Sequence, residues 1–403
     1  MCRGVNNKKG STNEGDIIRR TGASDKEKEE SPSRDQDPGP NTPSPPPTKT
    51  AQEGGGASAS EKHKEPKKDE TGVIESRKDS KDDAVPGAEQ QVHKWIQRTL
   101  DMGVPALRNE YRQLSKWCPE GMTYDAFKAN QGAQPQRNRY QDVPCGDARR
   151  VVIKFPGAPC EYIHANFVKT PQAENRFICT QGPLENTVVD FWYMVIQEAV
   201  ETIVMLCNFL ETGKTKCHKY FPMEKDETMT ITPDITVTNT KIGPMCPEEP
   251  SVKLSMLKVK FKKDGKEETR MIRHFHWQDW PDRGVPPCRL TSTELLSRIR
   301  DNQKPIVVHC SAGIGRTGTI VAIEHVLESL QYGKECVDMD KLLKELREQR
   351  PWSIQNDLQY LYIHRILLYY FLEKHKAKNQ ALLTPDNQAK YKQFSEEYEK
   401  ATT

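Results

Sequence analysis

Val307-Val308-His309-Cys310-Ser311-Ala312-Gly313-Ile314-Gly315-Arg316-Thr317-Gly318 is the stretch of sequence that decides the fold. The apolar segment just before the cysteine opens with Pro305, and it predicts a short buried strand that ends at Val308. After the stretch, apolar residues recur at helical spacing from Ile320 to Leu330. The sequence therefore predicts a strand, a loop and a helix in that order.

The loop of this unit combines one cysteine, three glycines and an arginine six positions after the cysteine. Glycines let backbone N–H groups turn inward, and a helix that begins near Arg316 adds its positive end, so the loop can bind an anion such as phosphate. The same field lowers the pKa of a thiol, which makes Cys310 a candidate nucleophile. Arg316 can bind two phosphate oxygens at once. The alternative is a small core cysteine, which needs neither the glycines nor the C-x5-R-T spacing.

The segment HCSAGIGRTG, residues 309–318, resembles the signature of the cysteine-dependent protein tyrosine phosphatases and matches their tyrosine-specific branch throughout. The resemblance extends over about residues 91–376. It implies an α+β fold, a single domain in which helices flank a twisted mixed β-sheet. It also implies that phosphate is bound by the loop that contains Ser311, Ala312, Gly313, Ile314, Gly315 and Arg316.

Composition separates one folded unit from the two ends of the chain. Residues 1–90 contain no Phe, Trp or Tyr and are rich in charged residues, Ser, Pro and Gly, a composition that is typical of disordered chain. We therefore expect a disordered arm over residues 1–90, a catalytic domain over 91–376 and a C-terminal tail over 377–403. The tail carries a helix start at Thr384 and aromatic residues at helical spacing after it, so it either packs on the domain or binds a partner.

Charge and cysteine content exclude several classes of function. The formal net charge of +3 is nearly balanced and does not indicate nucleic-acid binding. The eleven cysteines form no CxxC pair and no zinc spacing, which indicates a reducing, cytoplasmic setting. No run reaches the roughly 20 apolar residues of a membrane span. The proline-rich run Thr42–Pro47 could bind a proline-reading domain.

The spacing of apolar residues predicts the remaining elements. Alternating β-branched residues between Thr228 and Trp277 predict an antiparallel meander. Strands are also expected at 150–155, from 162, at 177–181 and at 202–207, and helices at 92–114 (one or two), 188–200, 338–349 and 357–372.

A thiolate alone is insufficient, because the leaving tyrosyl oxygen must be protonated. The segment Trp280-Pro281-Asp282 resembles the core of the family's mobile acid loop, which implies that Asp282 donates this proton and later accepts one from water. The resemblance also assigns Trp280 to the hinge, while Gly284 limits the shapes of the closed loop. Without the resemblance the segment could be an ordinary turn, and Asp279 would be an equally acidic neighbour.

Two further segments match loops of the family. In NRYQDV, residues 138–143, the resemblance implies that Tyr140 stacks on the substrate ring and that Asp142 holds the peptide backbone. In SIQNDLQ, residues 353–359, it assigns the positioning of water to Gln355, with Gln359 nearby, although Asn356 stands where the family usually has Thr. Each aromatic or amide could instead be an ordinary packed or surface residue.

The resemblance also implies roles for residues around the signature. Glu211 would orient Arg316 and Lys216 would face the acid loop, although exposed charges usually face solvent. The hydroxyl of Thr317 would assist departure of the cysteine sulfur, and His309 would orient the loop. His164 replaces an Asn of the family's Y-I-N-A-N segment, which we expect to shift a structural hydrogen bond.

The expected function is hydrolysis of phosphotyrosyl proteins through a phosphocysteine intermediate. No metal and no cofactor are expected, because Arg316 and backbone amides can neutralise the phosphoryl charge. One alternative is a phosphotyrosine-binding scaffold without turnover, which the presence of nucleophile, acid, arginine and water-positioning amide disfavours. The other is a dual-specificity phosphatase, which Tyr140 and the length of the domain disfavour.

Overall fold

β11 (Ile306–His309), the strand that leads into the signature loop, lies at the centre of a mixed sheet in the computed structural model, which describes residues 85–402. Within these residues the order of the large sheet is β1-β2-β3-β11-β4-β10-β9-β8-β7. β11 runs parallel to both neighbours, and Val308 is in register with Cys179 on β3 and Val204 on β4. Ile306, Val307 and Val308 are fully buried, as expected for a parallel strand covered on both faces.

The remaining strands pair mostly in antiparallel fashion, so the predicted α+β fold with a mixed sheet is confirmed. β10 also runs parallel to β4, whereas β7 to β10 form the predicted antiparallel meander. The strands are β1 (Arg150–Val152), β2 (Tyr162–Thr170), β3 (Ala173–Thr180), β4 (Thr202–Met205), β5 (Leu210–Glu211), β6 (Lys214–Thr215), β7 (Thr228–Thr232), β8 (Ile235–Pro244), β9 (Val252–Lys263), β10 (Lys266–Trp277) and β11.

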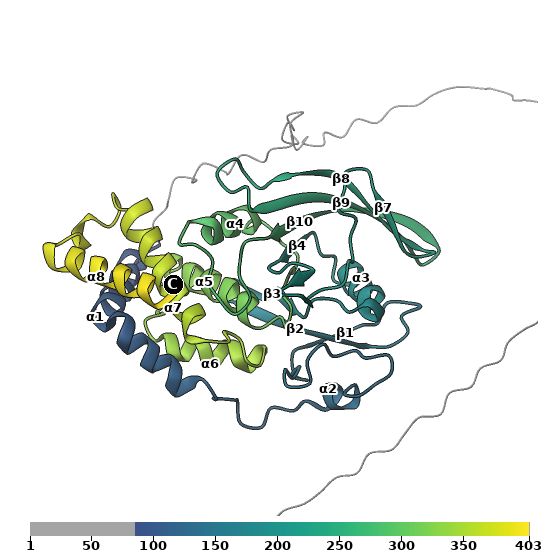
Figure 1. The fold of residues 1–403 in the computed structure, drawn as a ribbon, viewed down its shortest axis with the longest axis horizontal. Coiled ribbons are helices and arrows are strands. Elements are labelled where there is room, and N and C mark those ends of the chain that lie inside the picture. The colour runs from purple at the N-terminus through teal and green to yellow at the C-terminus, as the bar shows by residue number, and fades with distance from the viewer. Residues whose placement is uncertain (1–84, 403) are drawn as a thin grey trace, which may run out of the picture. The chain divides into compact units, whose positions relative to one another are not determined.

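Helices α5 and α7 lie on one side of the central strands and α3 lies on the other side (Figure 1). α5 packs on β2, β3 and β11 and is buried along almost its whole length, because it also contacts α1, α4, α6 and α7. The helices are α1 (Ala88–Leu114), α2 (Asp125–Ala129), α3 (Val188–Gln197), α4 (Thr291–Ile299), α5 (Gly315–Gln331), α6 (Met339–Gln349), α7 (Asp357–Tyr369) and α8 (Pro385–Thr402), with shorter helical turns η1 (Glu185–Thr187), η2 (Tyr370–Lys374) and η3 (Gln380–Leu382).

Several boundaries differ from the predicted ones. β1 ends at Val152 rather than residue 155. β3 begins at Ala173, since pairing with β2 continues to the connecting turn. α1 begins at Ala88, before the expected boundary at residue 91, and is kinked at Gly103, which has φ 63° and lies two residues before Pro105.

The C-terminal helix α8 packs on α1 and α7 (Figure 1). Phe394 and Tyr398 are buried in this contact, and the hydroxyl of Tyr391 accepts a hydrogen bond from Arg365 at 3.0 Å. The expected disordered arm and the proline-rich run lie in residues 1–84, outside the described residues. Within the described part of the chain, no helix combines the length and the apolar composition that crossing a bilayer requires.

Candidate active site

The signature loop connects the end of β11 to the start of α5, and its glycines meet two different demands. Gly313 has φ 70°, and a Cβ there would lie 2.1 Å from the carbonyl oxygen of Thr180, so a side chain is excluded. A side chain is disfavoured at Gly315 for another reason, since its Cβ would lie 2.9 Å from the side chain of Gln359 and 3.1 Å from that of Gln355. The first glycine permits the turn and the second admits the two amides.

The carbonyl groups of the loop are held on its outer side. Arg350, which is fully buried, donates from Nε to the carbonyl of Gly313 at 3.0 Å and from Nη2 to that of Ala312 at 3.1 Å. Backbone N–H groups consequently turn inward, and that of Gly313 donates to Cys310 Sγ at 3.2 Å. Arg350 was not predicted, because no local motif marks a residue whose partners are distant in sequence.

The electrostatics of the loop favour a thiolate at Cys310. Burial alone raises the pKa of this thiol, but the guanidinium of Arg316, the hydroxyl of Thr317 and backbone N–H groups of Thr317 and Gly313 bring the pKa below its ordinary value. The Thr317 hydroxyl is buried and makes no hydrogen bond of normal geometry within residues 85–402, yet it is close enough to favour the thiolate. The loop therefore favours the form of Cys310 that can act as a nucleophile.

His309 is a neutral, buried ring beneath the loop. Burial lowers its pKa to about 3, so the ring carries no charge near neutral pH. Nδ1 lies 3.2 Å from the Cys310 carbonyl, which can only accept, so Nδ1 holds the proton and Nε2 accepts from the Tyr220 hydroxyl at 2.7 Å. Tyr220 in turn accepts from Nε2 of His274 at 2.6 Å. These contacts fit the expected orienting role of His309. Tyr220 was not predicted, since its partners on β10 and β11 are distant in sequence.

Arg316 is fixed by a bidentate ion pair with Glu211. Its Nη1 and Nη2 lie 2.6 Å and 2.8 Å from the two carboxylate oxygens, and both side chains are buried. Glu211 belongs to the hairpin β5–β6, whose turn residues Thr212 and Gly213 have φ 47° and 73°, as a tight hairpin turn requires. This hairpin was not predicted as strands, because each strand has only two residues.

The predicted acid loop lies against the signature loop. Asp282 Oδ2 accepts from Lys216 Nζ at 2.6 Å and Asp282 Oδ1 lies 3.3 Å from Arg316 Nη2. Arg316 also donates to the carbonyl of Trp280 at 3.0 Å, and the Trp280 ring is buried. Asp279, the alternative acid, instead accepts from the Trp277 ring at 2.5 Å. Of the two carboxylates, the structure therefore brings Asp282 to Arg316.

The remaining predicted residues surround the same loop. The hydroxyl of Tyr140 lies 2.8 Å from Ser311 Oγ, which donates to the Lys216 carbonyl at 3.0 Å. Asp142 is exposed, and within residues 85–402 no hydrogen bond joins it to the other predicted site residues. Gln355 is exposed at the site, and its backbone N–H donates to the buried side chain of Gln359 at 2.9 Å.

His164, which replaces an Asn of the family pattern, lies beneath the segment 138–143 that contains Tyr140. Its Nε2 donates to the Val143 carbonyl at 2.8 Å, and its Nδ1 accepts from Arg350 at 3.1 Å. Burial, with a smaller effect of Arg350, lowers the pKa of His164 to about 3. The ring thus connects residues 138–143 to the arginine that holds the signature loop.

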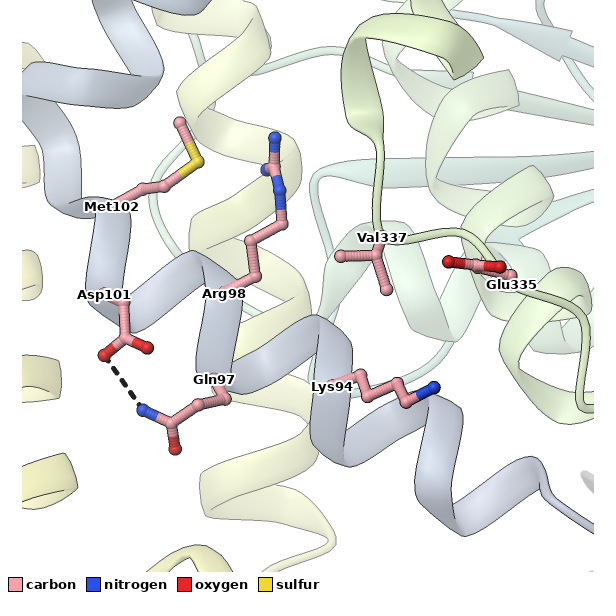
Figure 2. Close-up of a pocket in the computed structure, with 7 residues that line it drawn as sticks. All are labelled: Lys94, Gln97, Arg98, Asp101, Met102, Glu335 and Val337. Carbon is pink, nitrogen blue, oxygen red and sulfur yellow. Dashed lines mark hydrogen bonds between the residues drawn. The ribbon is translucent and has the colours of Figure 1, made fainter.

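Within residues 85–402 there is no metal-binding group of side chains, and a surface hollow there lies outside the predicted site. No group of three or more His, Cys, Asp or Glu side chains within residues 85–402 is arranged to hold a metal ion. A surface hollow on α1 and the segment between α5 and α6 is lined by charged side chains of both signs, together with Gln97, Met102 and Val337 (Figure 2). None of the residues drawn there belongs to the predicted site.

Comparison with known proteins defines the class. The family model described as protein-tyrosine phosphatase matches residues 134–369, so the chain belongs to the protein-tyrosine phosphatase family, as the signature segment predicted. The chain is 33% identical over 300 residues to human tyrosine-protein phosphatase non-receptor type 12, covering 70% of this chain and 37% of that protein. It is 35% identical over 300 residues to human tyrosine-protein phosphatase non-receptor type 9, covering 69% of this chain and 49% of that protein. The chain thus spans less than half the length of these relatives.

A solved structure of PTPN18, described as the structural basis of its fingerprint on distinct HER2 tyrosine phosphorylation sites, has a TM-score of 0.60 and 27% identity. The alignment covers 70% of this chain and 100% of that chain. A second structure, PTPN18 in complex with HER2 phosphopeptides, aligns at a TM-score of 0.56 with 29% identity and covers 66% of this chain and 99% of that chain.

Proposed function

We propose that this protein is a tyrosine-specific protein phosphatase that hydrolyses phosphotyrosyl proteins through a phosphocysteine intermediate. One observation carries the proposal: Asp282 and the Glu211-bound guanidinium of Arg316 meet beside a loop whose N–H groups turn toward the thiol of Cys310. This arrangement combines a nucleophile, a phosphate-binding cation and an acid within one site.

In the first step, the Cys310 thiolate attacks phosphorus, an S–P bond forms and the bond to the tyrosyl oxygen breaks. Asp282 gives its proton to the departing oxygen, so tyrosine leaves neutral. Arg316 and the loop N–H groups bind the phosphoryl oxygens as charge shifts between them.

In the second step, water attacks the phosphocysteine, the S–P bond breaks and inorganic phosphate leaves. Asp282, now ionised, accepts a proton from that water, and Gln355 holds the water in position. Thr317 favours the departing thiolate through its hydroxyl. This role is consistent with its contribution to the lowered pKa of Cys310.

Phosphotyrosine is the favoured substrate because of the position of Tyr140, whose hydroxyl forms a hydrogen bond with Ser311 at the edge of the site. The ring of Tyr140 provides an aromatic wall there, which suits a long, flat side chain. In the proposed mechanism, Asp142 contacts the backbone of the bound peptide and Lys216 contacts the closed acid loop. Phosphopeptides bound by PTPN18 support the same chemical class of substrate here. We place the protein in the cytoplasm, with the run Thr42–Pro47 available to a proline-reading domain.

The test compares a phosphotyrosyl peptide with a phosphoseryl peptide of otherwise identical sequence, using the 403-residue chain. Wild type should hydrolyse only the first, Cys310→Ser should lose activity to background, and Asp282→Ala should lose about 10²- to 10⁴-fold in kcat. Cys118→Ser, which changes an exposed thiol, is the control and should be unaffected. An inactive wild type, or an active Cys310→Ser variant, would overturn the proposal.

A further inference from the structure

The side chain of Asn356 joins the acid loop to the glutamine-bearing segment. Asn356 is the N-cap of α7, and its Oδ1 accepts a hydrogen bond from the backbone N–H of Gln359 at 2.9 Å. Its Nδ2 donates to the carbonyl of Arg283 at 2.7 Å. Arg283 directly follows Asp282, so one side chain links the start of α7 to the residue next to the acid.

We propose that Asn356 is a positioning residue that holds the acid loop closed through its hydrogen bond to Arg283, here called the loop bridge. The inference rests on the proposed function, since it concerns how that function's acid is placed. It also gives a physical meaning to the replacement of the family's usual Thr. A threonine hydroxyl can cap a helix, but it lacks the separate acceptor and donor atoms of an amide.

The loop bridge reaches the acid loop beyond Asp282, from an element outside the loop. Arg316 binds Trp280 and Asp282, Lys216 binds Asp282, and Asn208 donates to the carbonyl of Gln278 at 2.8 Å. All of these bonds engage residues 278–282. Beyond Asp282, the Trp280 ring donates to the carbonyl of Gly284 at 3.1 Å and the backbone N–H of Gly284 donates to the carbonyl of Pro281 at 3.3 Å, and both bonds stay within the loop.

The backbone at Arg283 makes this contact significant. Arg283 has φ 59°, a left-handed conformation that is unfavourable for a residue with a side chain. A hydrogen bond to its carbonyl offsets part of that cost when the loop is closed. The contact from α7 therefore favours the closed loop.

Asn356 also links the acid loop to the segment that contains Gln355. Gln355 precedes Asn356, and its backbone N–H donates to Oε1 of Gln359. The backbone N–H of Gln359 in turn donates to Oδ1 of Asn356. The bond from Asn356 to Arg283 thus joins the residue that follows Asp282 to the segment that contains Gln355. Both residues act in the hydrolysis of the phosphocysteine in the proposed mechanism.

The experiment measures the closed-to-open ratio of the acid loop in the 403-residue chain without turnover. The probe is the fluorine resonance of 5-fluorotryptophan at Trp280, assigned with Trp280→Phe. Asn356→Asp and Asn356→Thr both keep an oxygen that caps α7 and both remove the amide donor. Asn130→Ser is the control, since Asn130 Nδ2 makes a comparable 2.9 Å bond to a backbone carbonyl on α2.

Loss of one hydrogen bond predicts a closed-to-open ratio that is about two- to tenfold lower in both Asn356 variants and unchanged in Asn130→Ser. Turnover of a phosphotyrosyl peptide should show a lower kcat with little change in KM, while the urea midpoint stays near that of wild type because the cap is kept. A ratio equal to that of wild type in both variants would refute the loop bridge. An inactive wild type whose ratio still responds to Asn356 would refute the proposed function alone.

Discussion

Replacing Glu211 by Gln removes the carboxylate that fixes Arg316 and leaves a side chain of the same shape. Glu211 contributes both oxygens at 2.6 Å and 2.8 Å to a pair whose two side chains are only 3% and 8% exposed. Removing one member of a buried ion pair costs about 3–5 kcal/mol of folding free energy. We expect the lower end, about 3 kcal/mol, because the Trp280 carbonyl and Asp282 still contact the guanidinium.

The same change should weaken catalysis. A hydrogen bond to a charged group contributes about 1.5–3 kcal/mol, and loss of that amount from the orientation of Arg316 predicts a fall of about 10- to 100-fold in kcat/KM. Urea unfolding and steady-state hydrolysis of a phosphotyrosyl peptide measure the two effects. Glu267→Gln is the matched control, because Glu267 forms an exposed pair with Lys260 at 3.7 Å and should change stability by less than about 0.5 kcal/mol.

If Glu211→Gln unfolds at the urea concentration of wild type and keeps its kcat/KM, Glu211 neither stabilises nor orients Arg316. A loss of stability with full activity would show that Glu211 supports the fold but does not orient the arginine.

Three further predictions concern parts of the fold that support the site. His164 has a pKa of about 3 in the folded protein, so between about pH 6.5 and pH 3 only the unfolded chain binds this proton. The free energy of unfolding therefore decreases as the pH is lowered through this range, by about 1.4 kcal/mol per pH unit. His164→Asn should remove about 2 kcal/mol of the loss between about pH 6.5 and pH 5, measured by urea unfolding. Gly313→Ala should reduce kcat/KM by about 100-fold, because its Cβ would lie 2.1 Å from the Thr180 carbonyl and must displace the loop. Phe394→Ala, which empties a buried site on α8, should cost about 3–5 kcal/mol in urea unfolding.

Each of these predictions has a contrasting result. An unchanged slope of stability against pH in His164→Asn would show that the ring gains its proton in the native state. Gly265→Ala shares a positive φ of 76° but has open space around it, so equal losses of activity in both glycine variants would exclude the steric reason. A Phe394→Ala variant as stable as wild type would mean that α8 adds nothing to the domain.

Local patterns predicted the parts of the site that are continuous in sequence. The strand, loop and helix around Cys310 follow from one apolar run, the glycines and one helical repeat, and the meander follows from alternation between Thr228 and Trp277. The family was recognisable from residues 309–318 alone.

Contacts between distant segments could not be read in this way. Arg350 and Tyr220 carry no motif, and their partners on the signature loop become neighbours only when β11 takes its central place in the sheet. Asn356 was visible only as a departure from the family pattern, since its bond to Arg283 spans 73 residues of sequence. The packing of α8 depends on the position of α1, which the tail itself does not specify.

Direct detection of the phosphocysteine tests the central claim. The measurement is mass spectrometry of peptides from the enzyme after rapid acid quenching during turnover of a phosphotyrosyl peptide. Gln355→Ala should slow the hydrolysis step and accumulate one phosphoryl group on the peptide that contains Cys310, whereas Cys310→Ser should carry none. Turnover by wild type with no phosphoryl group on Cys310 in the Gln355→Ala variant, or with the group on another residue, would contradict the mechanism.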